Sequence, residues 1–155
     1  MIEVEPIGWV RGGRIEAVDD DWGDVEATIA LDPSRFSPDA LLGLDGFSHV
    51  EVVYCFHLLD PTDVVVGTRR PRGNPEWPLV GIFAQRGRVR PNRLGITTVE
   101  LVAVDGLDVR VRGLDAVDGS PVLDLKPYMA GFAPRTPVHE PEWALEIMRD
   151  YWHLP

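Results

Sequence analysis

The stretch SHVEVVYCFHLL, residues 48–59, decides the fold class. Every second residue in it is large and apolar, and successive side chains of a β-strand point to opposite faces. The face predicted to be buried carries Val50, Val52, Tyr54, Phe56 and Leu58. Cys55 is the only cysteine, which excludes an intrachain disulfide, and we interpret it as a small buried residue. The run therefore predicts a β-strand.

Shorter runs on both sides of this stretch also have the character of strands. They span residues 1–10, 25–31, 80–84, 97–104, 109–111 and 122–125. Residues 37–42 and 141–152 favour short helices, and residues 60–78, with four prolines, favour a long loop. Because strands do not alternate with helices, the pattern predicts a mainly β fold. We expect a small single-sheet antiparallel β-barrel with short peripheral helices.

The length of 155 residues fits one ordinary domain. We expect the barrel domain to span residues 1–133, and a C-terminal extension with one helix, residues 134–155, to pack on it. No apolar run is long enough to cross a bilayer, and the first residues lack the basic-then-apolar order of a secretory signal. These features predict a cytoplasmic protein with no membrane partner.

Positive charge is concentrated in residues 69–93, where seven arginines and one glutamate give a net charge of +6, although the whole chain carries −10. The arginines are Arg69, Arg70, Arg72, Arg86, Arg88, Arg90 and Arg93. Arginine binds carboxylates and phosphates through paired N–H groups. We interpret these arginines, with Asn92, as an anion-binding site. A solvated arginine-rich loop is the alternative.

Several common catalytic patterns are missing from the sequence. It contains no glycine-rich dinucleotide motif, no phosphate-binding loop and no G-x-S-x-G hydrolase signature. The four histidines, at positions 49, 57, 139 and 153, lack the spacing of metal ligands. We therefore predict no metal site and none of the usual nucleotide-binding folds.

Residues 81–101 combine a strand, a turn rich in arginine, proline and glycine, and a second strand. Pro91 fixes its backbone angle φ and Gly95 permits a positive φ, so the turn can be stiff and shaped. Amide groups on such a turn can line a ligand, and the arginines add positive charge.

The sequence here resembles the TsaA-like (TrmO-type) family of methyltransferases that depend on S-adenosyl-L-methionine (SAM). The matching segments are Phe83–Arg86, Arg90–Gly95, Leu114–Tyr128 and Gly43–His49, with a weaker match at Ile7-Gly8. The resemblance extends over residues 1–133. It implies a small β-barrel that binds SAM, usually as a homodimer with the pocket near the subunit boundary. It also implies methylation of the exocyclic nitrogen of threonylcarbamoyl-adenosine beside the tRNA anticodon.

The resemblance further implies which residues contact the cofactor. They are His57, Leu58, Arg86, Ile96 and the turn Arg112, Gly113, Leu114 and Asp115, with Lys126 and Tyr128 close to the same pocket. Many bacterial members carry a cofactor loop of Pro-Arg-Gln type before the second strand. Residues 19–23 stand at that place here, and Trp22 either stacks on adenine or fills the core.

The chemistry of these residues suits SAM, which carries a carboxylate, a sulfonium and an adenosine. Arg86 can pair the carboxylate, and Asp115 or Asp118 can accept hydrogen bonds from the ribose hydroxyls or the amino group. His57 is the candidate catalytic base, since the ordinary pKa of histidine lies near neutrality. A buried structural histidine is the alternative for this residue.

Three functions stay open on this basis. The first is methylation of tRNA, the second is SAM-dependent methylation of a small molecule or peptide, and the third is SAM binding without catalysis. Many family members carry a further C-terminal domain thought to help hold tRNA, whereas one helix is expected here after residue 133. The arginines of residues 69–93 supply most of the evidence for an anionic acceptor.

Overall fold

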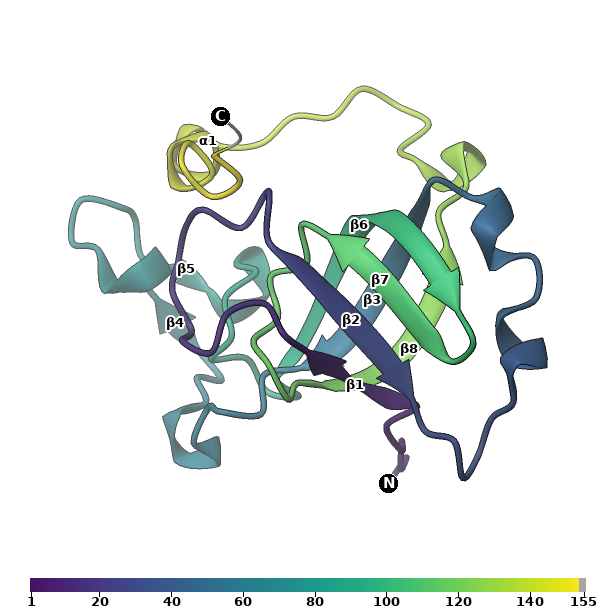
Figure 1. Cartoon of the computed structure of the whole chain (residues 1–155). Coiled ribbons are helices and arrows are strands. Elements are labelled where there is room, and N and C mark those ends of the chain that lie inside the picture. Colours follow the sequence, from purple (N-terminus) through teal and green to yellow (C-terminus); the bar gives the residue numbers. More distant parts are fainter. Residues whose placement is uncertain (154–155) are drawn as a thin grey trace.

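In the computed structural model, which describes residues 1–153, six antiparallel strands form a closed β-barrel (Figure 1). The strands are β1 (Gly8–Arg11), β2 (Glu26–Leu31), β3 (His49–Cys55), β6 (Leu94–Asp105), β7 (Asp108–Arg112) and β8 (Pro121–Pro127). Their order around the barrel is β1-β2-β7-β6-β3-β8. The barrel closes where β1 pairs with β8, with Gly8 opposite Val122. The predicted mainly β fold, a single-sheet antiparallel barrel with short helices, is confirmed.

The interior of the barrel is filled by every second residue of its strands. β3 buries Val50, Val52 and Tyr54, as the alternation predicts. The remaining strands contribute Val10, Ala27, Ile29, Leu31, Val99, Val109, Val111 and Val122. Removing apolar surface from water stabilises a fold by about 25 cal/mol per Å². The shared interior is therefore what holds the sheet in its closed form.

Gly95 allows the ring of Tyr54 to lie against β6. The two residues face each other across the β3–β6 pair, and a Cβ atom on Gly95 would lie 2.5 Å from Cζ of Tyr54. No real side chain tolerates that separation. The glycine thus makes room for a large inward-facing aromatic residue whose hydroxyl belongs to the site described below.

Several predicted boundaries are wrong. β1 begins at Gly8 rather than at Met1, since Pro6 has no N–H group to donate to a sheet. The predicted strand over residues 80–84 is only β5 (Val80–Gly81), followed by a 3₁₀ turn. The predicted loop over residues 60–78 contains β4 (Thr68–Arg69), which pairs with β5 in a separate two-stranded sheet.

The helical elements are short. Within the described part of the chain, six of them are 3₁₀ turns, at Pro38–Leu41, Leu44–Gly46, Pro61–Asp63, Pro71–Gly73, Ile82–Ala84 and Ala130–Phe132. The helix predicted over residues 141–152 is shorter in the structure, where α1 spans Glu142–Ile147. The chain turns after it, and the carbonyls of residues 150–152 accept hydrogen bonds from the amides of residues 21–23 instead of continuing the helix. The predicted extension, residues 134–155, includes two residues, 154 and 155, that lie outside the described residues. No helix within residues 1–153 has the length and apolar character needed to cross a membrane.

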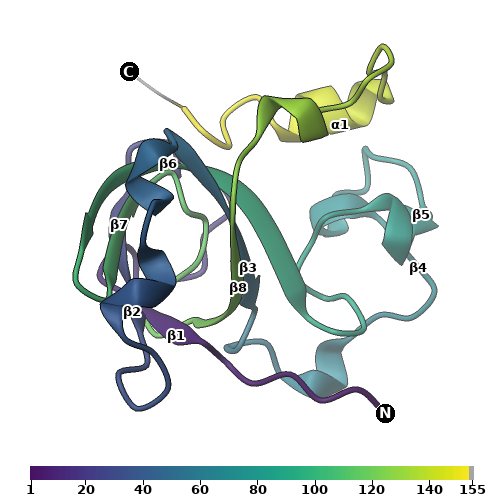
Figure 2. The ribbon, with the colours of Figure 1, turned by 90° about the vertical axis from the view of Figure 1, so that its right-hand side faces the viewer.

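The segment that joins β3 to β6 and the C-terminal segment meet beside the barrel. Figure 2 shows β4 and β5 next to the barrel with α1 above them, and the chain after α1 returns across the barrel. The segment joining β3 to β6 thus lies beneath the C-terminal segment. This arrangement surrounds the residues of the candidate site.

Candidate functional site

Asp115 is surrounded by hydroxyl groups. It lies in the loop between β7 and β8, residues 113–120, and is half-buried. The hydroxyl of Tyr54 donates to Oδ1 of Asp115 at 3.0 Å and to its main-chain oxygen at 3.1 Å. The hydroxyl of Thr97 donates to Oδ1, and the hydroxyl of Tyr151 donates to Oδ2. Residues from β3, β6 and the C-terminal segment therefore hold one carboxylate.

Both tyrosine hydroxyls of this cluster stay protonated at neutral pH. Burial raises the pKa of Tyr54 well above its ordinary value, and the negative charge of Asp115 adds to the rise. The pKa of Tyr151 is raised by the same two causes in the same order. The positive charges of Arg72 and Arg86 oppose the rise in the pKa of Tyr151.

Arg86 connects the arginine-rich segment, residues 60–93, to β6. Its Nη2 atom donates to the main-chain oxygen of Ile96 at 2.8 Å, while the rest of the side chain is exposed. Ile96, Leu58 and Phe83 are exposed apolar side chains. An arginine with free N–H groups, held on the main chain of β6, is suited to binding a carboxylate. The structure therefore brings together Arg86 and Ile96, two of the predicted cofactor contacts.

His57 follows β3 and has an unusual environment. Its Nδ1 atom is buried and has no hydrogen-bond partner among residues 1–153. Its other ring nitrogen lies beside Gly119, where an added Cβ would be 3.6 Å away. A buried polar atom without a partner costs free energy, so a ligand that supplied one would bind favourably here.

The predicted turn 112–115 is divided between the surface and the interior. Arg112 is tied to Glu26 at 2.6 Å and Glu100 at 3.0 Å, and hydrogen bonds to these carboxylates raise its pKa. Leu114 is fully buried, with its main chain as well as its side chain. Gly113 has φ of +87°, a conformation that glycine adopts without strain.

Lys126 and Tyr128 lie at the opposite end of the β3–β8 pair from His57. Lys126 faces Glu51 across the strands, and its ammonium lies 3.4 Å from a carboxylate oxygen of Asp124. The amide of Tyr128 donates to the main-chain oxygen of His49, at the start of β3. The structure does not bring these two residues into the hydroxyl cluster around Asp115.

Trp22 is buried, with 2% of its surface exposed. Its indole N–H donates to the carbonyl of Val18 at 3.1 Å, and the guanidinium carbon of Arg14 lies 4.7 Å from the ring centroid. Stacking of an adenine on this ring would therefore require Arg14 to move.

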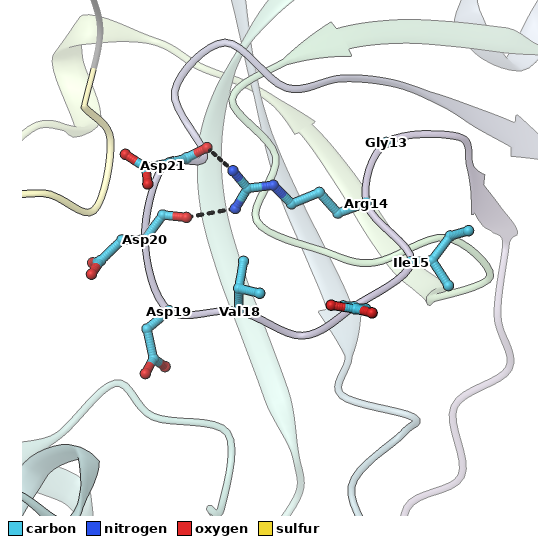
Figure 3. A pocket seen from close by; sticks show the side chains of 8 residues that line it. Gly13, Arg14, Ile15, Val18, Asp19, Asp20 and Asp21 are labelled. Atoms are coloured by element: carbon cyan, nitrogen blue, oxygen red, sulfur yellow. Dashed lines mark hydrogen bonds between the residues drawn. The ribbon is translucent and has the colours of Figure 1, made fainter.

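Beside this tryptophan lies a groove of about 760 Å³, shown in Figure 3. It is lined by residues 13–16 and 18–21. Figure 3 shows the Arg14 guanidinium donating to the carbonyls of Asp20 and Asp21, each at 2.5 Å. Four acidic residues, Glu16 and residues 19–21, line the groove, so it is unsuited to an anionic ligand.

Most of the predicted anion-binding arginines also hold the loop that carries them. Arg70, Arg90 and Arg93 donate to the carbonyls of Trp77, Gln85 and Leu59, respectively. Arg72 pairs with Asp20 at 3.0 Å. Arg69 is half-buried, and Arg70, Arg88 and Asn92 are exposed. Each guanidinium has five N–H groups, so these bonds leave donors for an anion.

Sequence reasoning missed Tyr151 and Thr97 as site residues and used Tyr54 only as a core residue. Tyr54 lies 61 residues from Asp115 along the chain, and Tyr151 lies 36 residues from it. The alternation of β3 gives the inward direction of Tyr54, but nothing local indicates its partner. Among residues 1–153, no group of three His, Cys, Asp or Glu side chains is suited to a metal ion.

The family model for the tRNA-methyltransferase O N-terminal domain matches residues 20–133. The chain belongs to this family. The match includes Asp115, Arg86 and His57, and it ends before α1 begins.

Named relatives give the same family assignment. A probable S-adenosyl-L-methionine-binding protein of Methanothermobacter thermautotrophicus is 39% identical over 134 residues, 82% of this chain and 90% of that protein. The tRNA (adenine(37)-N6)-methyltransferase of Escherichia coli is 39% identical over 97 residues, 59% of this chain and 40% of the enzyme. The crystal structure of TrmO from Pseudomonas aeruginosa superimposes with a TM-score of 0.71 at 28% identity, covering 89% of this chain and 61% of that one. This chain thus spans less than two thirds of both TrmO-type proteins.

Proposed function

We propose that this protein is a SAM-dependent methyltransferase that methylates the exocyclic nitrogen of threonylcarbamoyl-adenosine next to the tRNA anticodon. The cofactor is SAM, in keeping with the family and with relatives named as SAM-binding proteins. The tRNA acceptor follows from relatives named as tRNA (adenine(37)-N6)-methyltransferases. The threonylcarbamoyl group is the most specific part of the proposal, and it rests only on the sequence motifs that carry the family resemblance.

The observation that carries the proposal is the hydroxyl-bonded Asp115 with Arg86 nearby. A carboxylate offers about four acceptor positions. Three hydroxyls occupy three of them, two on Oδ1 and one on Oδ2. Among residues 1–153 no second donor reaches Oδ2, which leaves one of its positions for a ligand hydroxyl. A fixed carboxylate acceptor suits the ribose hydroxyls of SAM, and a guanidinium suits its carboxylate.

The neighbouring groups also fit this cofactor. The buried Nδ1 of His57 lacks a partner among residues 1–153, and Leu58, Phe83 and Ile96 are exposed apolar side chains. Aromatic faces and apolar side chains suit an adenine or a sulfonium. Gly113 and Leu114 lie in the same loop as Asp115, directly after Arg112 at the end of β7, and both are buried.

SAM, when bound, supplies an electrophilic methyl group on a sulfonium. The protein has to hold the acceptor nitrogen in line with it, and positioning of this kind supplies much of the rate. Arg69, Arg70, Arg88 and Asn92 bind phosphates of the RNA and so fix the acceptor. His57 takes the proton that the acceptor nitrogen loses, through whichever ring nitrogen is unprotonated. Because the substrate is tRNA, the protein acts in the cytoplasm, and we propose that it does so as a homodimer.

The test is transfer of a labelled methyl group from SAM to tRNA by the purified protein, followed by mass spectrometry of the nucleosides. We expect methylated threonylcarbamoyl-adenosine from tRNA that carries the modification, and none from an unmodified transcript. Methylation of both RNAs would remove the threonylcarbamoyl requirement. Methylation of neither, with SAM bound, would exclude a tRNA acceptor.

A further inference from the structure

The segment of residues 142–153, which we call the C-terminal clasp, contacts three other parts of the chain around the site. Glu146 accepts a hydrogen bond from the indole N–H of Trp77 at 2.8 Å, which joins the clasp to the arginine-rich segment. The amides of Asp21, Trp22 and Gly23 donate to the carbonyls of residues 150–152 at 3.1, 2.9 and 2.9 Å. The hydroxyl of Tyr151 reaches Asp115. Figure 2 shows this segment lying across the barrel and the β4–β5 sheet.

Tyr151 has a place in the site that no other described residue shares. Oδ1 of Asp115 has two hydroxyl donors, Tyr54 and Thr97, whereas Oδ2 has only Tyr151 among residues 1–153. Loss of one donor on Oδ1 leaves the other in place. Loss of the Tyr151 hydroxyl leaves Oδ2 without a donor among residues 1–153, so water can take either of its acceptor positions. The direction of the remaining acceptor position on Oδ2 therefore depends on Tyr151.

The clasp holds the Tyr151 ring firmly. The ring packs edge-on against Trp152, with centroids 4.8 Å apart, and the main-chain bonds to residues 21–23 lie on both sides of it. A donor that is already fixed loses little entropy when a ligand binds, so it favours binding by preorganisation.

We propose that Tyr151 is a positioning residue of the cofactor site, which orients Oδ2 of Asp115 toward a hydroxyl of SAM. The C-terminal clasp is then an integral wall of the site, although it lies after the family-matched residues 20–133. This inference rests on the proposed function, and it assigns to the site a residue that the matched region does not contain.

The experiment is calorimetric titration of SAM into the purified full chain and its variants. Tyr151→Phe removes one oxygen and keeps the ring. We expect it to weaken SAM binding about tenfold, the effect of one hydrogen bond to a charged group. Tyr54→Phe leaves Thr97 on Oδ1, and we expect it to weaken binding by about threefold or less. Equal binding by Tyr151→Phe and the natural protein would overturn the inference.

Two further variants distinguish the positioning role of Tyr151 from a general structural effect of the clasp. Trp77→Phe removes the bond to Glu146 on α1 and leaves the main-chain bonds that hold Tyr151, and the cluster around Asp115, in place. We expect its SAM affinity to stay within twofold of the natural protein, and a loss as large as that of Tyr151→Phe would overturn the inference. In an Asp115→Asn background, Tyr151→Phe should weaken binding no further, because it acts through the carboxylate. Additive losses would contradict that.

The same titration distinguishes failure of the inference from failure of the proposed function. If the natural protein binds no SAM, the proposed function fails, and the inference fails with it. If the natural protein binds SAM and Tyr151→Phe binds it equally well, only the inference fails.

Discussion

The barrel and the arginine-rich segment of residues 60–93 are held together in different ways. The barrel buries a continuous set of apolar side chains, among them Ile29, Val50 and Val52, which are fully buried. In residues 60–93 the buried residues are Pro71, Ile82 and Gln85, and arginine side chains bond to main-chain carbonyls. Burial stabilises the first region, and polar bonds shape the second. The comparison indicates that the arginines serve both the shape of the segment and its charge.

The largest effect is expected in the barrel. Ile29→Ala removes a fully buried side chain and leaves a cavity, which should lower the free energy of unfolding by about 3 kcal/mol. Denaturation by urea with a fluorescence readout measures it. A loss below about 1 kcal/mol would show that the interior is not packed as described.

A smaller and more local effect is expected in the arginine-rich segment. The buried side-chain amide of Gln85 donates to the carbonyls of Arg69 at 2.7 Å and Val80 at 3.2 Å. Gln85→Ala leaves both carbonyls without this donor, a cost of about 1–3 kcal/mol. Hydrogen exchange should speed up in residues 67–90 and stay unchanged in β3 and β6. Equal acceleration in the barrel would mean that the two regions unfold together.

The ion pair between Arg72 and Asp20 should contribute less. Its side chains are 24% and 33% exposed, and such pairs are worth about 1 kcal/mol or less. A double-mutant cycle with Arg72→Ala and Asp20→Ala measures the coupling at low salt and at 0.5 M salt. We expect the coupling to shrink at high salt, and a coupling that salt does not change would contradict a partly exposed pair.

The smallest effect is expected at two aspartates near the surface, one from each region. Asp32 follows β2 and accepts hydrogen bonds from Ser34, and Asp60 in the segment accepts them from Thr62. These bonds lower the pKa of both carboxyls. A depressed folded-state pKa gives stability that is present above the ordinary aspartate pKa and is lost as the pH falls through the folded-state pKa.

NMR titration of the two carboxyl groups checks this prediction. Both midpoints should lie below the ordinary aspartate pKa, and Asn at either position should remove the local acid sensitivity. A midpoint at or above the ordinary value would contradict the hydrogen bonds.

The difference between the two regions also decides how far the sequence could predict them. The barrel was predicted because Val50, Val52 and Tyr54 repeat with the period of a strand. The β4–β5 sheet was missed because each strand has two residues, too few to show a period. The predicted length of α1 was too great because the apolar spacing of Ile147 and Tyr151 is helical, although the Tyr151 hydroxyl bonds to Asp115.

The site was predictable only where local motifs mark it. Arg86 and Asp115 stand in segments that carry the family resemblance, so both were candidates from the sequence. The hydroxyl donors to Asp115 come from three distant places in the chain, and only the closed barrel brings them together. The sequence could not show that Arg90 and Arg93 hold the loop in addition to carrying charge. A charge pattern does not indicate which carbonyl a guanidinium contacts.

The most direct test of the central claim is calorimetric titration of SAM into the natural protein, Arg86→Ala and Arg88→Ala. Arg86 donates to the main-chain oxygen of Ile96 on β6, the residue before Thr97 of the Asp115 cluster, whereas Arg88 is exposed in the same turn as Arg86. We predict one SAM bound per chain, a loss of affinity of about tenfold or more for Arg86→Ala, and unchanged SAM affinity for Arg88→Ala. Absence of SAM binding, or equal losses in the two variants, would contradict the account.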